Sequence, residues 1–388
     1  MKRTRFLIAG PLSIVASAAA TTALLGSPAV SAARPDHDAR SFVQTNLVSD
    51  VPGLAEHTDP NLVNPWGQAS APGTTGSPIW VSDNGAGKAT VLTGDGTPFL
   101  LANNPLVVTL ATPPSEGRNE VAAPTGQLFN TFDNTSTNFV IHEGTKSGPA
   151  FFVFATEDGT IEGWNPNVDP THAIIAVDRS TVTDPEGDIG AVYKGITAAT
   201  TPSGKFLFAS NFRFGTVEVF DSQFNLVRTL SDPNVPAGFA PFGIHNPGTG
   251  KVFVTFAEQN AAKHDDVAGR GNGLVDEFSP DTSTLQRFAS RGRLNSPWAV
   301  TLAPATFGAF GGDLLIGNFG DGHINAFDQS GTFEGHLRNV AGDALTIPGV
   351  WGLRFGNGTN GASANALFFT AGINNEADGL FGTLVPQP

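Results

Sequence analysis

Residues 159–165 read Gly-Thr-Ile-Glu-Gly-Trp-Asn, and this pattern returns along the chain. It consists of a glycine, any residue, an aliphatic residue, two variable residues, an aromatic residue and a small polar residue. Further copies begin at Gly215, Gly273 and Gly322, and a weaker copy begins at Gly87. Repeats of about 50 residues that each carry several short strands are typical of β-propeller blades.

A second phrase, built on proline or glycine, an aromatic residue and glycine, recurs upstream of the first. Its copies lie at 64–67, 240–243, 296–299 and 349–352, with looser versions at 123–126 and 193–195. Counting either phrase predicts six units, in which this second phrase opens the innermost strand and the first phrase forms the third strand. The last unit has no outer strand of its own, and residues 41–48 resemble the missing one. We therefore predict an all-β, six-bladed β-propeller of four-stranded antiparallel blades, with the ring closed by the N-terminal strand.

The N-terminal residues have the composition of a targeting segment. Lys2, Arg3 and Arg5 precede an apolar, alanine-rich run at 6–25, and small residues near Ala32-Ala33 suit a signal peptidase. We predict a signal peptide over 1–33, a linker over 34–40 and a single propeller domain over 41–388. The mature protein would be extracellular or periplasmic, with no membrane span. A membrane anchor is the alternative interpretation of the apolar run.

Composition excludes several functions. The net charge of −14 argues against nucleic acid or anionic lipid as a partner, since both require basic patches. It is compatible with binding cations, and the alternative is that it only keeps the protein soluble outside the cell. The absence of cysteine excludes disulfides, redox catalysis by thiols and structural zinc. We expect a monomer that binds a small molecule, a glycan or a protein.

The loops that lead into the inner strands and those that join second to third strands lie on one face of a propeller. At the second-strand ends we place Asp83, Glu157, Asn211 and Asn318 in matching register, with Phe256 and Ala371 at the two apolar positions. Polar ends in four units and apolar ends in two make this axial face asymmetric, which directs the search for function to it.

Other polar residues join this face. Asn61 and Asn64 precede the first inner strand, and an insertion at 257–272 carries His264, Asp265 and Asp266. Long loops inside compact repeats are usually functional or disordered. We take Asn61, Asn64, Asn318, His264, Asp265 and Asp266 as candidate ligand-binding residues. The alternative is that the insertion is a solvated loop and that the Asp and Asn residues cap turns.

The phrases at 61–67, 82–85 and 264–273, with the six-fold pattern, resemble a family of secreted bacterial propellers without settled chemistry. The chain is also similar to NHL-type propellers and, more distantly, to gluconolactonase-like ones. The latter resemblance implies one divalent ion at the mouth of the channel, held by a Glu, Asn and Asp set that Glu157, Asn211 and Asp83 match in type. Carboxylate and amide oxygens suit Ca²⁺ or another divalent cation. Asp83 and Glu157 are then the catalytic candidates.

Trp66, Phe242, Trp298 and Trp351 recur at the openings of the inner strands. Their periodicity favours packing between adjacent blades. The alternative is an aromatic rim that stacks on a sugar or another apolar ligand.

Two functions stay open from the sequence. The first is a secreted binding module that recognises a ligand or protein through its polar axial face. The second is a divalent-metal-dependent hydrolase of lactonase type, in which the metal would polarise a carbonyl and a carboxylate would activate water. Whether the protein is an enzyme depends on which of the two holds.

Overall fold

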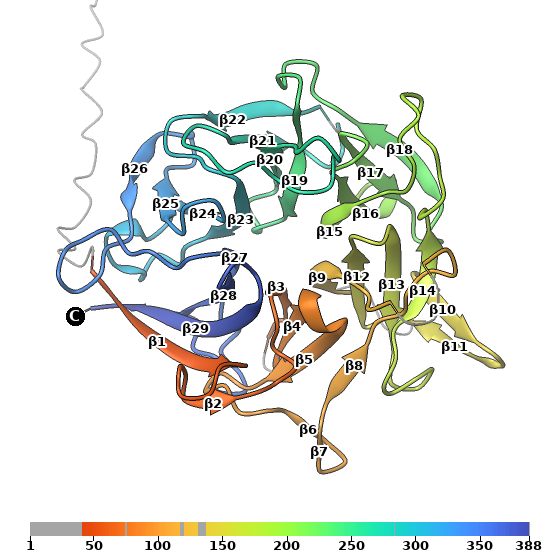
Figure 1. Ribbon diagram of the computed structural model, residues 1–388, viewed down its shortest axis with the longest axis horizontal. Helices are drawn as coiled ribbons and strands as arrows, with labels where there is room; N and C mark the ends of the chain where they lie inside the picture. Colours follow the sequence, from red (N-terminus) through yellow and green to blue (C-terminus); the bar gives the residue numbers. More distant parts are fainter. Residues whose placement is uncertain (1–40, 74–75, 117–119, 131–136, 283, 388) are drawn as a thin grey trace, which may run out of the picture. The chain divides into compact units, whose positions relative to one another are not determined.

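A computed structural model describes residues 41–73, 76–116, 120–130, 137–282 and 284–387. The expected signal peptide at 1–33 and linker at 34–40 lie outside the described residues. Six small four-stranded sheets stand around a central axis as the blades of a propeller (Figure 1). This confirms the predicted fold. No helix in these described ranges has the length and hydropathy of a membrane span.

Each blade is an antiparallel sheet whose strands follow one another from the axis outward. Blade one contains β3 (Pro65–Ala69), β4 (Ile79–Asp83), β5 (Lys88–Leu92) and β8 (Val107–Thr109). Blade two contains β9 (Pro124–Phe129), β12 (Phe152–Thr156), β13 (Thr160–Trp164) and β14 (Ile174–Asp178). Blade three contains β15 (Tyr193–Thr201), β16 (Gly204–Asn211), β17 (Thr216–Phe220) and β18 (Leu226–Leu230).

The second half of the ring continues the pattern. Blade four contains β19 (Phe239–His245), β20 (Val252–Glu258), β21 (Leu274–Phe278) and β22 (Gln286–Ser290). Blade five contains β23 (Pro297–Leu302), β24 (Leu314–Asn318), β25 (Ile324–Phe327) and β26 (Phe333–His336). Blade six contains β27 (Val350–Phe355), β28 (Leu367–Ile373), β29 (Asp378–Pro386) and β1 (Phe42–Ser49).

Smaller elements decorate the blades. They are β2 (His57–Thr58), which pairs in parallel with β1, the hairpins β6 (Leu100–Leu101)–β7 (Asn104–Pro105) and β10 (Val140–Glu143)–β11 (Lys146–Pro149), and the 3-10 turns η1 (Asn84–Ala86) and η2 (Gly308–Phe310).

The ring is closed by strands from the two ends of the chain. β1 runs antiparallel to β29, from the pair Phe42 and Pro386 to the pair Ser49 and Leu380. The N-terminal strand thus supplies the fourth strand of blade six, as the sequence predicts. Closure of this kind covers strand edges that would otherwise be open to aggregation.

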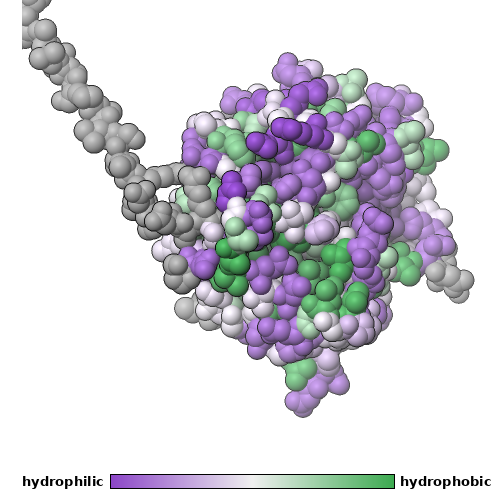
Figure 2. Space-filling view, turned by 60° about the vertical axis from the view of Figure 1, so that its left-hand side comes forward, coloured by the Kyte–Doolittle hydropathy of each residue, from purple (hydrophilic) through white to green (hydrophobic). Residues whose placement is uncertain are grey.

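The recurring glycine phrase has a physical basis. At Gly159 and Gly322 the φ angle is +82° and +73°, a left-handed conformation that side chains oppose, and each glycine closes the turn between the second and third strands. The aliphatic and aromatic positions that follow, such as Ile161 and Trp164, are buried between blades. Outer strands such as β18 are largely exposed. On the face of the molecule in Figure 2, hydrophilic residues predominate and hydrophobic ones lie in separate patches.

Substitution of Phe42 tests how much the closure of the ring contributes to stability. Its ring is buried and lies 4.8 Å from Phe307 and 6.2 Å from Phe310 between ring centroids. We expect Phe42→Ala to lower the free energy of unfolding by about 4 kcal/mol, because it leaves a cavity at the seam. Val43→Ala is the matched control, since Val43 follows in the same strand and is 39% exposed, and it should cost less than about 1 kcal/mol. Urea denaturation measures both, and equal losses would contradict the role assigned to the seam.

Candidate functional site at the axial mouth

One position of each inner strand faces the axis, at a break in the register between the first and second strands. The residues at this position, from blade one to blade six, are Trp66, Thr125, Lys194, Phe242, Trp298 and Trp351. Each follows a residue that pairs with the second strand, at its last residue in blades one, two, three and five and two residues earlier in blades four and six. All six are buried. Four blades therefore place an aromatic side chain toward the axis, while blade two places a threonine and blade three a lysine.

The four aromatic rings pack against one another across the ring of blades. Trp66 of blade one lies 6.5 Å from Phe242 of blade four and 6.0 Å from Trp298 of blade five, between ring centroids. Trp351 stacks on Trp66 at 3.5 Å. The expected packing between adjacent blades is present, since blades one and six and blades five and six are neighbours, and it extends across the axis to blade four. The rings close the axis as a buried plug, and they do not form the open rim that was the alternative.

Lys194 stands among these aromatic residues with its ammonium group directed to carboxylates. Its side chain is 2% exposed, and its Nζ lies 5.3 Å from the centroid of Trp66 and 5.8 Å from that of Phe212. Nζ donates a hydrogen bond to Oε1 of Glu157 and lies 3.7 Å from Oδ1 of Asp265. A buried ammonium requires such partners, because its desolvation is otherwise unfavourable.

Amide side chains of blade one extend this cluster and connect it to blade six. Asn84 donates to Oε2 of Glu157 at 2.9 Å. Asn64, whose φ is +46°, donates to Oδ1 of Asn84 at 3.3 Å and to Oε2 of Glu376 at 2.8 Å. The indole nitrogen of Trp351 in turn donates to Oδ1 of Asn64 at 3.0 Å. The cluster is therefore tied directly to the aromatic plug.

The insertion at 257–272 reaches the same point from blade four. His264 Nδ1 and Asp265 Oδ1 are 2.8 Å apart, and Asn260 donates to the other oxygen of Asp265 at 3.1 Å. Gln259 donates to the carbonyl oxygen of Phe212 at 2.7 Å, which fixes the base of the insertion to blade three. Potential ligand atoms of Glu157, His264 and Asp265 all lie within 4.8 Å of one another. We call Glu157, Lys194, His264, Asp265, Asp266 and Glu376 the axial cluster.

The acids of the axial cluster differ in protonation behaviour. The hydrogen bond with His264, assisted by the charge of Lys194, lowers the pKa of Asp265 to about 2. Burial raises the pKa of Asp266, and it also raises that of Glu376, while Lys194 opposes both shifts. The lysine thus acts electrostatically on carboxyl groups from blades two, four and six.

The predicted register of Glu157 is wrong by one residue. Pro65 pairs with Asp83 and Tyr193 with Asn211, but the equivalent Pro124 pairs with Thr156. Glu157 therefore lies one residue beyond the strand end, in the loop. This displacement directs its carboxylate to Lys194, whereas the strand-end residues Asp83 and Asn211 are held inside their own blades.

The remaining predicted residues have local partners. Asp83 is fully buried, accepts a hydrogen bond from the Thr90 N–H at 3.0 Å, and has its pKa raised by burial. Asn211 donates to Glu218 at 3.1 Å, and Asn318 donates to the Arg293 carbonyl at 2.7 Å. Asn61 accepts from Lys88 at 2.6 Å. The hydrogen bonds of the described residues bring Glu157, Asn64, Asp265 and His264 together, and do not join Asp83 or Asn211 to them.

Lys194 and Asn84 are the members of the mouth that the sequence reasoning missed. The signal for the lysine was present, because 193–195 is a copy of the second phrase with lysine in the aromatic position.

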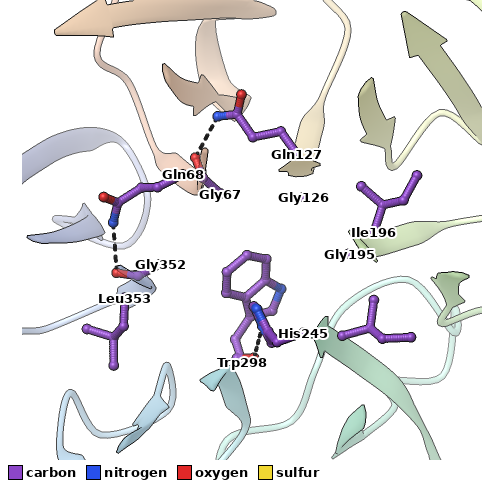
Figure 3. Close-up of a pocket in the computed structure, with 11 residues that line it drawn as sticks. Gly67, Gln68, Gly126, Gln127, Gly195, Ile196, His245, Trp298, Gly352 and Leu353 are labelled. Carbon is purple, nitrogen blue, oxygen red and sulfur yellow. Dashed lines mark hydrogen bonds between the residues drawn. The ribbon is translucent and has the colours of Figure 1, made fainter. Parts of the chain in front are cut away.

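Beyond the plug, further along the inner strands, lies a cavity of about 40 Å³ (Figure 3). Gln127 donates to the carbonyl oxygen of Gly67 at 2.9 Å and Gln68 to that of Gly352 at 3.1 Å. His245 lines the cavity, with its Nε2 2.8 Å from the carbonyl oxygen of Trp298. The cavity has room for one or a few water molecules. It is therefore too small for a ligand, and the axial cluster is the better candidate for a binding site.

Comparison with known proteins places the chain in a family. No protein-family model matches it. An uncharacterized protein of Acanthamoeba polyphaga mimivirus is 32% identical over 346 residues, 87% of this chain and 78% of that protein. A second uncharacterized protein of the same virus is 31% identical over 348 residues, 87% of this chain and 84% of that protein. The chain belongs to the family of these viral proteins. Membership of a secreted bacterial family stays a prediction.

Solved structures of low sequence identity are similar to this chain. A streptogramin B lyase has a TM-score of 0.50 and 13% identity, over 89% of this chain and 97% of that chain. A gluconolactonase from Xanthomonas campestris has a TM-score of 0.49 and 13% identity, over 84% of this chain and 87% of that chain. At these identities the likeness concerns the fold alone.

The ion pair of Lys194 and Glu157 can be tested by a double-mutant cycle. We expect Lys194→Met to lower the free energy of unfolding by about 3 kcal/mol, because it leaves buried carboxylates without their cation. Adding Glu157→Gln to this variant should recover part of the loss, since one of those carboxylates is then neutral. Urea denaturation at pH 7 measures the four proteins. A coupling energy near zero would contradict the pairing.

His245 gives a pH test of the axial cavity. Burial lowers its pKa to about 4 from the ordinary 6.5, against the opposing hydrogen bond to Trp298. The neutral ring is thus favoured in the folded state, and its contribution is present above pH 6.5 and lost as the pH falls toward 4. We expect His245→Gln to reduce the loss of unfolding free energy between pH 7.5 and 4.5 by on the order of 2 kcal/mol. Identical pH profiles of variant and wild type would contradict the burial of a neutral histidine.

Proposed function

We propose that this protein is a ligand-binding propeller whose axial mouth takes a small cationic ligand. One observation carries the proposal: the carboxylates of Glu157 and Asp265 meet at the buried ammonium group of Lys194. The carboxyl groups of Asp266 and Glu376 lie on the same face and interact electrostatically with that ammonium group. Four acids against one lysine leave an excess of negative charge at the mouth. Because Lys194 is already paired, an added anion would meet repulsion and an added cation attraction.

The surroundings of the cluster support binding from the outer face. The aromatic plug closes the axis beneath it, so a ligand is confined to the loop side. The carboxylates are held by hydrogen bonds from Asn64, Asn84 and Asn260, which reduces the ordering that binding would require. The net charge of −14 adds a long-range attraction for cations. The N-terminal pattern supports our further proposal that the protein acts outside the cell. We also propose that it is a monomer.

A divalent-metal-dependent hydrolase of lactonase type is the second candidate. The observation in its favour is the convergence of Glu157, His264 and Asp265 within 4.8 Å, a set that replaces the predicted Asp83, Glu157 and Asn211. One imidazole and two carboxylates suit Zn²⁺ or Mn²⁺ better than the all-oxygen preference of Ca²⁺. A bound metal would polarise a carbonyl of the substrate. This candidate ranks second because the Lys194 ammonium already occupies an oxygen of Glu157.

Isothermal titration of the protein with two sets of probes separates the candidates. Organic cations such as benzylammonium and putrescine test the proposal, and the chlorides of Ca²⁺, Mn²⁺ and Zn²⁺ test the alternative. We expect organic cations to bind with a Kd of roughly 1 mM or below, more weakly at high salt. Asp266→Asn should weaken this binding about fivefold, because it removes one of the four acids. Glu143→Gln, an exposed acid of the hairpin β10–β11, is the control and should leave it unchanged.

The outcomes are distinct. Binding of organic cations that depends on Asp266 supports the proposal. Tight binding of one metal that is lost in His264→Ala, without binding of organic cations, supports the hydrolase instead. Absence of both, in a protein with normal thermal unfolding, contradicts the proposal.

A further inference from the structure

A second cavity opens on the axial face beside the cluster, between blades five and six. It has a volume of about 370 Å³, within the usual range for small-molecule pockets. Its walls come from the loop that follows β24, the segment that leads into β27 and the loop that follows β28, with Ala268 contributed by the insertion. We call it the inter-blade pocket. It borders the axial cluster through Glu376, which lines it.

One wall of the inter-blade pocket is an aromatic platform. Phe319 is partly exposed, and its buried side stacks on Trp351 with 3.8 Å between centroids and 16° between planes. Trp351 stacks on Trp66 in turn. Trp66, Trp351 and Phe319 therefore form a continuous aromatic stack that ends at the pocket. Stacking of this kind fixes the orientation of Phe319 and leaves a flat surface for another ring.

Another part of the pocket is polar and acidic. Asp321, Asn374, Asn375 and Glu376 line it, and no lysine or arginine is among the lining residues. Asn64 donates to one carboxylate oxygen of Glu376, and the other oxygen accepts no hydrogen bond from the described residues. The φ angles of residues 374–376 are +54°, +55° and +66°, a conformation that residues other than glycine rarely adopt. Glu376 is the last of these three residues, and the hydrogen bond from Asn64 fixes its carboxylate.

We propose that the inter-blade pocket binds a cyclic ligand that carries a protonated amine, with its ring on Phe319 and its ammonium group at Glu376. This inference rests on the proposed function and names the ligand class for it. The platform selects a ring, the acids select a cation, and the volume accommodates a single ring with a short substituent. A neutral sugar would use the ring wall and the amides without needing the charge of Glu376. An anionic ring would be repelled by Asp321 and Glu376.

Four probes of similar size separate these features. Benzylamine has both the ring and the charge, benzyl alcohol lacks the charge, butylamine lacks the ring, and benzoate carries the opposite charge. Titration calorimetry or saturation-transfer NMR on the full protein measures their binding. We expect benzylamine to bind at least fivefold more tightly than benzyl alcohol and butylamine, and benzoate not to bind.

Variants then place the ligand. Glu376→Gln should weaken benzylamine about tenfold and leave benzyl alcohol unchanged. Phe319→Leu should weaken benzylamine about fivefold and leave butylamine unchanged. Because Phe319→Leu disturbs a stacked core, Thr346→Trp provides a second route: it fills the pocket from an exposed position and should abolish benzylamine binding. Glu143→Gln and Phe333→Leu are the matched controls. Glu143 is exposed in β10, and Phe333 is exposed in β26, the outer strand of blade five.

The result can also separate this inference from the proposed function. If organic cations bind, depend on Asp266 and ignore Phe319, Glu376 and Thr346, the mouth binds cations and the inter-blade pocket does not, which overturns the inference alone. If benzylamine and benzyl alcohol bind equally and Glu376→Gln changes neither, the pocket takes a neutral ring and the inference is overturned. Absence of any binding by these probes overturns it as well.

Discussion

The close approach of six inner strands around one axis is the constraint on which the rest of the structure depends. A Cβ atom added at Gly243 would lie 2.0 Å from the carbonyl oxygen of Trp298, and one added at Gly352 would lie 2.5 Å from that of Trp66. The inner strands approach too closely at these glycines for a side chain to fit there. The residue before each glycine, Phe242 or Trp351, is the one that directs its side chain to the axis. Four aromatic side chains at such positions fill it. Once the axis is filled, the channel is closed to ligands, and binding chemistry is left to the loops of one face.

Lys194 breaks this pattern, and two irregularities of the chain follow from it. A lysine in an aromatic position brings a positive charge into apolar surroundings, where it is stable only with carboxylates at hand. Glu157 supplies one by standing a residue beyond its strand end. Asp265 supplies another because the insertion at 257–272 is long enough to extend from blade four toward the ring mouth. The displaced register of blade two and the insertion in blade four therefore serve one electrostatic requirement.

The repeats in the sequence predicted the architecture well, because each blade carries its own copy of the same local requirements. The glycine phrase located the third strands, the second phrase located the inner strands, and the missing outer strand led to the closure by β1. The site was predicted less well. A period identifies equivalent positions but does not show that Glu157 is displaced from one by a single residue, since a one-residue shift redirects the side chain. Residues such as Asp83 and Asn211 shared the polar type of the site, yet burial and local hydrogen bonds hold them within their blades. The departure from the repeat at Lys194 was the more informative signal, because a charge in a position that is otherwise aromatic needs a partner.

The axial cluster and the inter-blade pocket are joined by a continuous series of hydrogen bonds. Lys194 donates to Glu157, Asn84 donates to the other oxygen of Glu157, and Asn64 donates to both Asn84 and Glu376. Asn64 also accepts from Trp351, whose ring supports Phe319. A cation at Glu376 would compete with Asn64 for that carboxylate. Any rotation of the Asn64 amide would change its hydrogen bonds with Asn84 and with Trp351. Buried polar networks behave as units for this reason, since each group is oriented by the next. The ammonium of Lys194 and a ligand at Glu376 are then two ends of one network, in which the internal cation sets the orientation of the groups that meet the external one.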